Sequence, residues 1–172
     1  MSEPANESSA QSEDRPPTAR VVTASNRAAA GVYEDTGGPL IVGWLRERGF
    51  ECPDAAVVPD GDPVRAELVR AVGERVDVVI TTGGTGISPT DATPEVTRSV
   101  LDYDIPGLAD AIRAVGAPTV PTAVLSRGVA GVAGRTLIVN LPGSRGGVKD
   151  GLRVLDDVIV HAVDQLRGGD HR

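Results

Sequence analysis

An uninterrupted apolar segment that runs into glycines is the feature that most restricts how this chain can fold. Residues 76–82, VDVVITT, have the length of a strand and few polar side chains, which is typical of a strand covered on both faces. The next four residues, Gly83, Gly84, Thr85 and Gly86, carry little side-chain bulk. Because a strand covered on both faces needs helices on both sides of its sheet, this segment favours an α/β domain.

The periodicity of the other segments supports the same class. Strands and helices alternate along most of the chain, and a glycine-spaced turn separates two β-rich runs near the C-terminal part. We therefore expect a three-layer αβα sandwich with a mainly parallel sheet and one short antiparallel strand pair. Strands are expected at 19–25, 55–60 and 76–82, the antiparallel pair at 123–127 and 135–139, and helices at 36–50, 62–73, 94–101, 106–116 and 145–167.

Two helix starts have identifiable cap residues. Asp62 precedes Pro63, so we expect Asp62 to be the N-cap of the helix over 62–73, with Leu68, Val69 and Val72 facing the core. Thr93 stands in the same relation to Pro94 and is expected to cap the following helix.

Composition excludes several classes of protein. A chain of 172 residues is about one domain, and a net charge of −7 without a Lys/Arg block argues against nucleic-acid binding. The single cysteine, Cys52, cannot form an internal disulfide, and no apolar run is long enough to cross a membrane. We expect a cytoplasmic protein with a disordered tail over 1–18, a folded domain over 19–168 and a short tail over 169–172.

Unusual residues follow the expected strands, where ligands bind in open α/β sheets. Ser25 and Arg27 follow the first strand, Asp60 the second, the glycine loop 83–86 the third, and residues 140–144 the last. Glycines let backbone N–H groups approach an anion, but they also simply make turns. The loop has no lysine of a Walker motif and lacks the third glycine of a dinucleotide fingerprint.

Carboxylates near the glycine loop favour the anion site over the plain turn. Asp91 follows Gly86 by five residues, and Asp60 ends a neighbouring strand. Mg²⁺ bound to a phosphate usually takes one or two carboxylates from the protein, so both residues are candidate metal ligands and catalytic groups. Simpler roles remain open: a helix cap for Asp91, a turn for Asp60, and a favourable charge in the first helical turn for Glu95.

Three motifs together carry a family resemblance. The segments TTGGTGISPTDATPE, VPTAVLSRGVAG and LIVNLPGS resemble the molybdenum-cofactor biosynthesis family that includes the bacterial Mog and MoaB proteins and the G domain of gephyrin. The resemblance covers about residues 19–166. It implies a trimer that binds molybdopterin and ATP, and its Mog branch transfers AMP from Mg-ATP to molybdopterin with release of pyrophosphate.

The resemblance also assigns residues. It implies phosphate binding by Gly83, Gly84, Thr85 and Gly86, catalysis and Mg²⁺ binding by Asp60 and Asp91, and substrate binding by Ser25, Arg27, Asn140, Pro142, Gly143 and Ser144. Glu95 is a further candidate for phosphate binding that the resemblance does not assign. Two positions depart from the family: Asn26 stands where Asp is common, and Thr90 where Arg or Lys is frequent.

The sequence therefore predicts a molybdopterin adenylyltransferase. Three alternatives stay open: a paralogue of the same fold that binds pterin without transferring AMP, a nucleotide pyrophosphohydrolase, and a non-enzymatic trimeric scaffold. The expected partners are molybdopterin, ATP, two further copies of the chain and the downstream molybdenum-insertion protein; no nucleic acid or membrane partner is expected.

Overall fold

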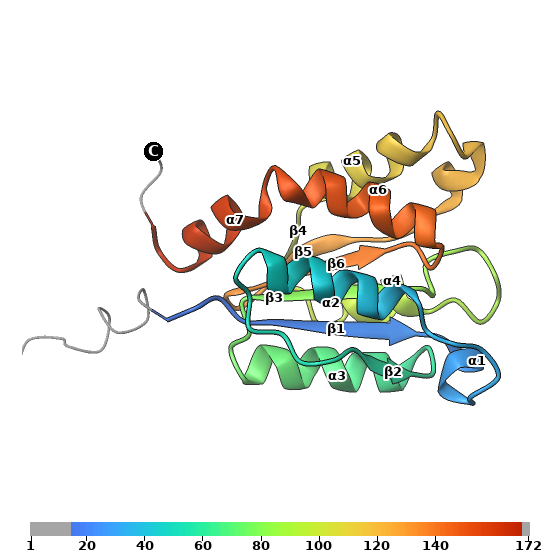
Figure 1. The fold of residues 1–172 in the computed structure, drawn as a ribbon, viewed down its shortest axis with the longest axis horizontal. Helices are drawn as coiled ribbons and strands as arrows, with labels where there is room; N and C mark the ends of the chain where they lie inside the picture. Colours follow the sequence, from blue (N-terminus) through green and yellow to red (C-terminus); the bar gives the residue numbers. More distant parts are fainter. Residues whose placement is uncertain (1–14, 170–172) are drawn as a thin grey trace, which may run out of the picture.

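A computed structural model describes residues 15–169, which form a single six-stranded sheet with helices on both faces (Figure 1). The strand order is β2-β1-β3-β6-β5-β4. Strands β2, β1, β3 and β6 are parallel, whereas β5 is antiparallel to both β6 and β4. The strands are β1 (Ala19–Ala24), β2 (Ala56–Val58), β3 (Val78–Thr82), β4 (Tyr103–Asp104), β5 (Ala130–Ala133) and β6 (Thr136–Leu141). The fold class is as predicted, and an antiparallel pair is present near the C-terminal part, although only one of its two strands lies where it was predicted.

The helices divide into two layers. One core cluster joins the sheet to α2, α5, α6 and α7, and a second joins its other face to α3 and α4. The helices are α1 (Asn26–Ala29), α2 (Gly37–Glu47), α3 (Asp62–Gly73), α4 (Thr93–Arg98), α5 (Pro106–Gly116), the 3₁₀ helix η1 (Pro121–Leu125), α6 (Arg145–Asp156) and α7 (Ile159–Leu166). Among the described residues, no helix has the length and apolarity that a membrane crossing requires.

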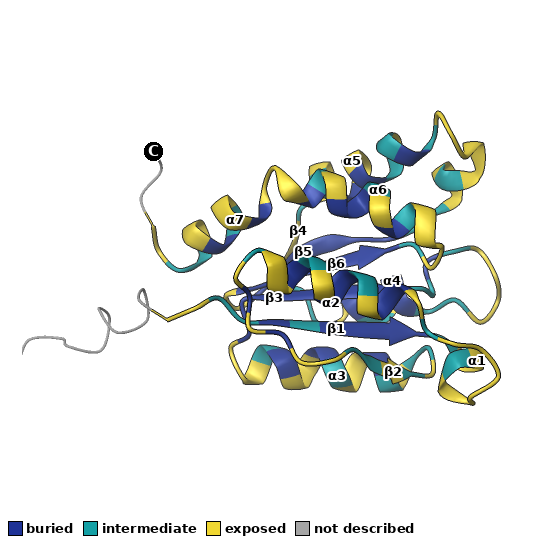
Figure 2. Ribbon diagram, in the orientation of Figure 1, coloured by how far each residue is buried: buried dark blue, intermediate teal, exposed yellow. Residues whose placement is uncertain are grey.

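The strand residues explain why both layers are needed. All five residues of β3 are buried, and consecutive ones face opposite layers: Val78 and Ile80 belong to the first cluster and Val79 to the second. Figure 2 shows the strands β3 and β6 buried along their length and the helices α2, α3 and α6 buried on one side and exposed on the other. Val, Leu, Ile and Ala supply the buried hydrophobic core apart from Phe50 and Cys52, as the low aromatic content requires.

Two predicted elements were wrong. Residues 123–127 are not a strand; most of them belong to η1, and the strand paired with β6 is β5 at Ala130–Ala133. Pro121 at the first position favours the helical turn. The predicted helix over 145–167 is interrupted at 157–158, within the run Asp-Asp-Val-Ile-Val of weak helix formers.

Three predicted details of the helix faces and caps were also wrong. The N-cap of α3 is Gly61, not Asp62. Val69 does not face the core as predicted: it is 46% exposed, whereas Val64 of the same helix is buried. Thr93 is the first residue of α4, not its cap. Its hydroxyl instead donates a hydrogen bond to Asp60.

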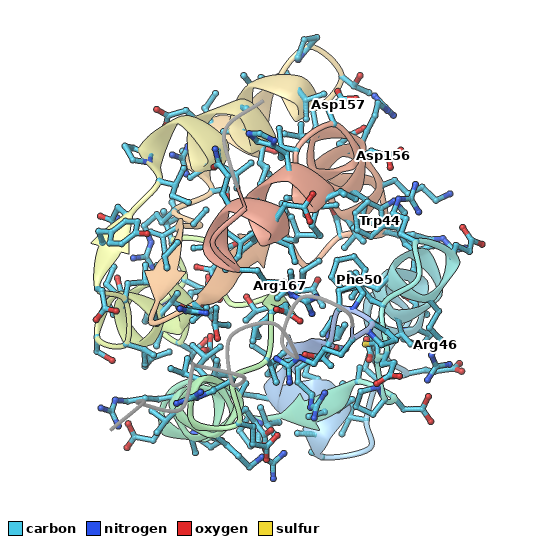
Figure 3. The ribbon with its side chains drawn as sticks, turned by 90° about the vertical axis from the view of Figure 1, so that its left-hand side faces the viewer. Trp44, Arg46, Phe50, Asp156, Asp157 and Arg167 are labelled. Atoms are coloured by element: carbon cyan, nitrogen blue, oxygen red, sulfur yellow. The ribbon has the colours of Figure 1, made fainter. Side chains whose placement is uncertain are left out.

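A buried ion pair lies where the strands begin, opposite the end at which ligands were expected. Arg167, labelled in Figure 3, donates two hydrogen bonds to the Asp77 carboxylate, at 3.0 and 2.8 Å. The backbone N–H of Thr18 donates to the same carboxylate at 2.8 Å, and Glu51 N donates to Pro17 O. Burial by itself would raise the pKa of Asp77, but these donors outweigh burial and lower it. Residues 15–18 of the predicted tail thus contact the domain, whereas 1–14 and 170–172 lie outside the described residues.

Two truncations test the contribution of this segment. We expect a chain lacking residues 1–14 to unfold at the wild-type temperature. A chain lacking 1–18 loses the bonds made by Thr18 and Pro17, each worth about 1 kcal/mol, and should unfold roughly 5 °C lower in a thermal melt. Equal unfolding temperatures for the two truncations would contradict a stabilising role for 15–18.

The substitution Asp77→Asn tests the ion pair. It leaves the buried guanidinium of Arg167 without its counter-charge, and we expect a loss of about 3 kcal/mol in urea unfolding at pH 7. Because the pKa of Asp77 is lowered in the folded state, its stabilising effect is complete above the unfolded pKa near 4 and declines as the pH falls through the folded pKa. The difference between wild type and variant should therefore shrink in acid.

The control for this experiment is Asp54→Asn, which removes an exposed ion pair with Arg46 and should change stability little at any pH. A wild-type-to-variant difference for Asp77→Asn that stays constant down to pH 2 would show that the loss is not electrostatic.

Candidate functional site

Three neighbouring parallel strands end at one edge of the sheet and place their following loops together. Thr23 of β1 is opposite Thr82 of β3, which is opposite Leu141 of β6. Thr82 Oγ1 donates to the carbonyl oxygen of Pro142 at 2.7 Å, and Gly83 N donates to Leu141 O at 3.2 Å. The loops after β3 and β6 are therefore bonded directly to each other.

Glycine is required where these loops meet. Gly83 has φ +89°, and a Cβ there would lie 2.4 Å from the carbonyl oxygen of Ala24. Gly84 has φ +67°, and a Cβ there would lie 2.3 Å from both Asp60 Oδ2 and Thr93 Oγ1. Since a larger residue at either position would be strained and would collide, the loop conformation depends on both glycines.

The loop presents backbone donors that the protein does not use. Among the described residues, the N–H groups of Gly84, Thr85 and Gly86 donate to no protein acceptor, whereas Gly83 N–H is used by Leu141. The N-terminus of the 12-residue helix α6 lies beside them, capped by Ser144, whose hydroxyl accepts from Gly147 N at 3.1 Å. Free N–H groups and a helix N-terminus together favour an anion such as phosphate.

Two cavities meet at this loop. The first, here called the η1 cavity, has a volume of about 320 Å³, and its wall includes Gly83–Gly86, Asp91, η1 and residues 142–144. The second, the Tyr33 cavity, has about 470 Å³, and its wall includes Ser25, Tyr33, Asp35 and Arg145. Gly83, Gly143 and Ser144 belong to both walls. The arrangement can hold two ligands in adjoining cavities, and the unused N–H groups of Gly84, Thr85 and Gly86 line the η1 cavity.

The two predicted carboxylates lie on either side of the glycine loop and have different surroundings. Asp91 Oδ2 accepts one hydrogen bond, from Ser88 N at 3.0 Å, and Asp91 lines the η1 cavity. Asp60 accepts from Gly61 N, from Ala92 N at 3.0 Å and from Thr93 Oγ1 at 2.9 Å. Asp91 therefore has a carboxylate available to a ligand, whereas the carboxylate of Asp60 holds the start of α4.

Asn140 and Glu95 likewise contact the protein. Asn140 is 3% exposed; its amide nitrogen donates to Thr81 and Thr97, and its oxygen accepts from Val129 N at 3.1 Å. Glu95 is paired with Arg127, whose hydrogen bond lowers the pKa of Glu95. Neither residue lines the two cavities, so the structure gives each a supporting position.

Ser25 lines the Tyr33 cavity, whereas Arg27 contacts Tyr33 but is not among the residues that line either cavity. The guanidinium of Arg27 lies over the Tyr33 ring, 5.6 Å from its centroid, and the Ser25 hydroxyl caps α1 by accepting from Ala28 N. Asn26, which stands where the family commonly has Asp, contacts the protein: its side-chain oxygen accepts a hydrogen bond from the backbone N–H of Asp60 at 3.0 Å.

Two parts of the cavity walls were missed from sequence. One is the segment 120–126, which contains η1. A strand was expected at 123–127, although the two prolines at 118 and 121 indicate a break in regular structure here. The other is the segment 33–35, to which no element was assigned, together with the residue at 36, where a helix was expected to begin. Asp35 in this segment accepts from Gly38 N at the start of α2, and this Asp-x-x-Gly spacing is a recognisable helix-start signal.

The side chains that could bind a metal ion determine how it would be held. The described residues contain no group of three or more His, Cys, Asp or Glu side chains suited to a metal ion. Mg²⁺ does not need such a group when substrate phosphates complete its shell, and one free carboxylate beside an anion loop fits that requirement. Asp91 meets it directly, and Asp60 fits better as its support.

Comparison with known proteins shows the family. A family model for a probable molybdopterin binding domain matches residues 20–161. The molybdopterin adenylyltransferase of Helicobacter pylori J99 is 37% identical over 152 residues, which are 86% of each chain. The solved structure of the Mog protein from Mycobacterium ulcerans is 63% identical with a TM-score of 0.85 and covers 87% of this chain and 99% of its own.

A third relative is similar over the same extent. The MoaB structure from Thermus thermophilus is 41% identical with a TM-score of 0.81 and covers 90% of this chain and 99% of its own. Sequence and fold thus agree over nearly all of the described chain, which belongs to the family of molybdopterin-binding domains found in the Mog and MoaB proteins.

Proposed function

We propose that this protein is a molybdopterin adenylyltransferase. The observation that carries the proposal is the set of N–H groups at Gly84, Thr85 and Gly86, which donate to no acceptor within residues 15–169 and line the η1 cavity together with Asp91. AMP transfer requires two phosphate-bearing substrates to meet, and the Tyr33 cavity adjoins the η1 cavity at Gly83, Gly143 and Ser144. Relatives named molybdopterin adenylyltransferase support the assignment.

The reaction joins a terminal phosphate oxygen of molybdopterin to the α-phosphorus of ATP, and the bond from that phosphorus to the bridging oxygen breaks to release pyrophosphate. A phosphate is already ionised at pH 7, so no side chain has to remove a proton from the nucleophile. The protein's contribution is to orient two phosphates and to offset their charge, which is how phosphoryl-transfer enzymes generally act.

Each part of the site has a role in this scheme. The N–H groups of the glycine loop and the N-terminus of α6 would bind phosphate oxygens. Asp91 would hold Mg²⁺, which neutralises phosphate charge when bound. Asp60 would keep the loop after Asp91 in place through Ala92 and Thr93.

The alternatives make different demands on the site. A pterin-binding paralogue without activity needs neither the Asp91 carboxylate nor a second cavity. A nucleotide pyrophosphohydrolase needs only one organic substrate and a water molecule. Two cavities that share Gly83, Gly143 and Ser144 favour the two-substrate transfer over both. The trimeric state, the contact with a molybdenum-insertion protein and the cytoplasmic location stay predictions.

The substitution Asp91→Asn is the sharpest test. It keeps the size of the side chain but removes the charge that would hold the metal ion, so we expect AMP transfer to molybdopterin to fall at least about 100-fold at unchanged thermal stability. Asp157→Asn, at the opposite end of α6, is the matched control and should keep full activity. Normal adenylylated product from Asp91→Asn would remove Asp91 from the mechanism.

A second substitution, Gly84→Val, tests the glycine loop. The new side chain would collide with Asp60 and Thr93 and would need an unfavourable positive φ. We expect calorimetry to show at least about tenfold weaker binding of ATP and of molybdopterin, since the glycine loop lies where the two cavities join. Gly43→Ala is the control, because that glycine lies within α2 with no heavy atom within 4 Å of the added Cβ. Native affinities for both ligands would show that the loop is only a turn.

A further inference from the structure

One arginine binds both ends of the loop that carries Asp91. Arg127 Nε donates to the carbonyl oxygen of Gly86 at 2.8 Å, and its Nη2 donates to the carbonyl oxygen of Asp91 at 3.0 Å. Its Nη1 is paired with Glu95 in the first turn of α4, and its backbone N–H donates to Thr85 O at 2.7 Å. The guanidinium thus has acceptors at three places along residues 86–95.

The loop between these points has few other external contacts. Residues 87–90 are exposed, and the bonds between Ser88 and Asp91 lie within the loop itself. On the other side, Asp60 accepts from Ala92 N and from Thr93 Oγ1. The segment 86–92, here called the acidic loop, is therefore held between an acid that binds its N–H group and an arginine that binds its carbonyl groups.

We propose that Arg127 is a positioning residue for Asp91 and that it ties the acidic loop to the wall of the η1 cavity. Arg127 follows Leu125 and Ser126, which line that cavity, whereas Asp91 lines it from the other side. Arg127 thereby couples the position of the Asp91 carboxylate to the wall of the η1 cavity, in which a ligand would lie. The expected effect of Arg127 on catalysis rests on the proposed function. Its effect on the order of the acidic loop can be measured whether or not the protein transfers AMP.

Arginine is the residue type that this geometry requires. Its planar group presents donors in several fixed directions and so reaches the Gly86 and Asp91 carbonyls and the Glu95 carboxylate together. A lysine keeps the charge but brings a single ammonium group, which cannot occupy the three directions. Because the guanidinium of Arg127 already donates to protein acceptors, Arg127 differs from an arginine that binds phosphate directly.

The experiment compares Arg127→Met and Arg127→Lys with the control Arg98→Met in the full-length chain. Arg98 is an exposed arginine of α4 that, like Arg127, lines a third cavity, of about 350 Å³, separate from the η1 and Tyr33 cavities. No hydrogen bond from Arg98 to the acidic loop is found among residues 15–169. Amide hydrogen exchange over residues 86–93, without any ligand, reports the order of the loop. The Mg²⁺ dependence of AMP transfer and the separate values of kcat and KM report its effect on the reaction.

We expect exchange over 86–93 to rise at least about tenfold in Arg127→Met and less in Arg127→Lys, with wild-type exchange in Arg98→Met. The Mg²⁺ concentration for half-maximal rate should rise and kcat should fall, each by about 10- to 100-fold, which is the usual effect of losing a group that orients a metal ligand. KM for molybdopterin should stay within about twofold, because the cavity walls keep their binding groups.

Unchanged exchange in both Arg127 variants would overturn the proposal, and so would a loosened loop with unaltered kcat and Mg²⁺ dependence. A large rise in KM for ATP with a protected loop would mean that Arg127 binds phosphate directly, which also overturns it. If the wild-type chain transfers no AMP, the proposed function fails, and the exchange data alone then decide whether Arg127 holds the loop.

Discussion

The direct bonding of the β3 and β6 loops is the constraint on which the rest of the site depends. Gly83 N–H donates to Leu141 O, Thr82 donates to Pro142 O, and a Cβ on Gly143 would lie 3.2 Å from Gly83 Cα. These contacts are possible only because both loops have glycine where they meet. They place the free N–H groups of the glycine loop beside the N-terminus of α6, and they form the wall shared by both cavities.

Several polar residues that were predicted to bind ligands also support this arrangement through hydrogen bonds to the protein. Asn140 links β6 to Thr81 of β3, Thr97 of α4 and the residue before β5 through three hydrogen bonds at 2.9–3.1 Å. Asp60 fixes the start of α4, and Asn26 in turn fixes the backbone of Asp60. Because these groups are satisfied by protein partners, their substitution would act on ligand binding through loop position.

The parts of the fold that follow from local patterns could be predicted from the sequence. The apolar run 78–82 and the glycines after it identify β3, its burial and the loop at its end. The 3₁₀ helix η1 could not be recognised in the same way, since Thr-Ala-Val-Leu fits a strand by composition and its helical turn depends on Pro121 and on packing against α5. The break at 157–158 is a similar case, because the stripe Val148, Leu152, Leu155, Ile159 continues across it.

The site shows the same limit. Sequence places Asp91, the glycine loop and residues 142–144 together, because they follow parallel strands that end at one edge of the sheet. It does not distinguish Asp60 or Asn140 as supports from Asp91 as a free carboxylate. That distinction depends on hydrogen-bond partners 11 to 59 residues away in the chain, which only the fold brings close.

Three arginines of this acidic protein donate their hydrogen bonds to protein acceptors. Arg113 donates to the carbonyls of Ser126 and Gly128, Arg127 to those of Gly86 and Asp91, and Arg167 to Asp77, so these cations stabilise the fold. The glycine loop itself offers backbone N–H groups, whose direction is set by the loop conformation. Binding of phosphate at such a site depends on the position of a few atoms more than on net positive charge. That dependence gives each of the residues that hold the loops, Asp60, Arg127 and Asn140, an influence on the reaction without contact with a substrate.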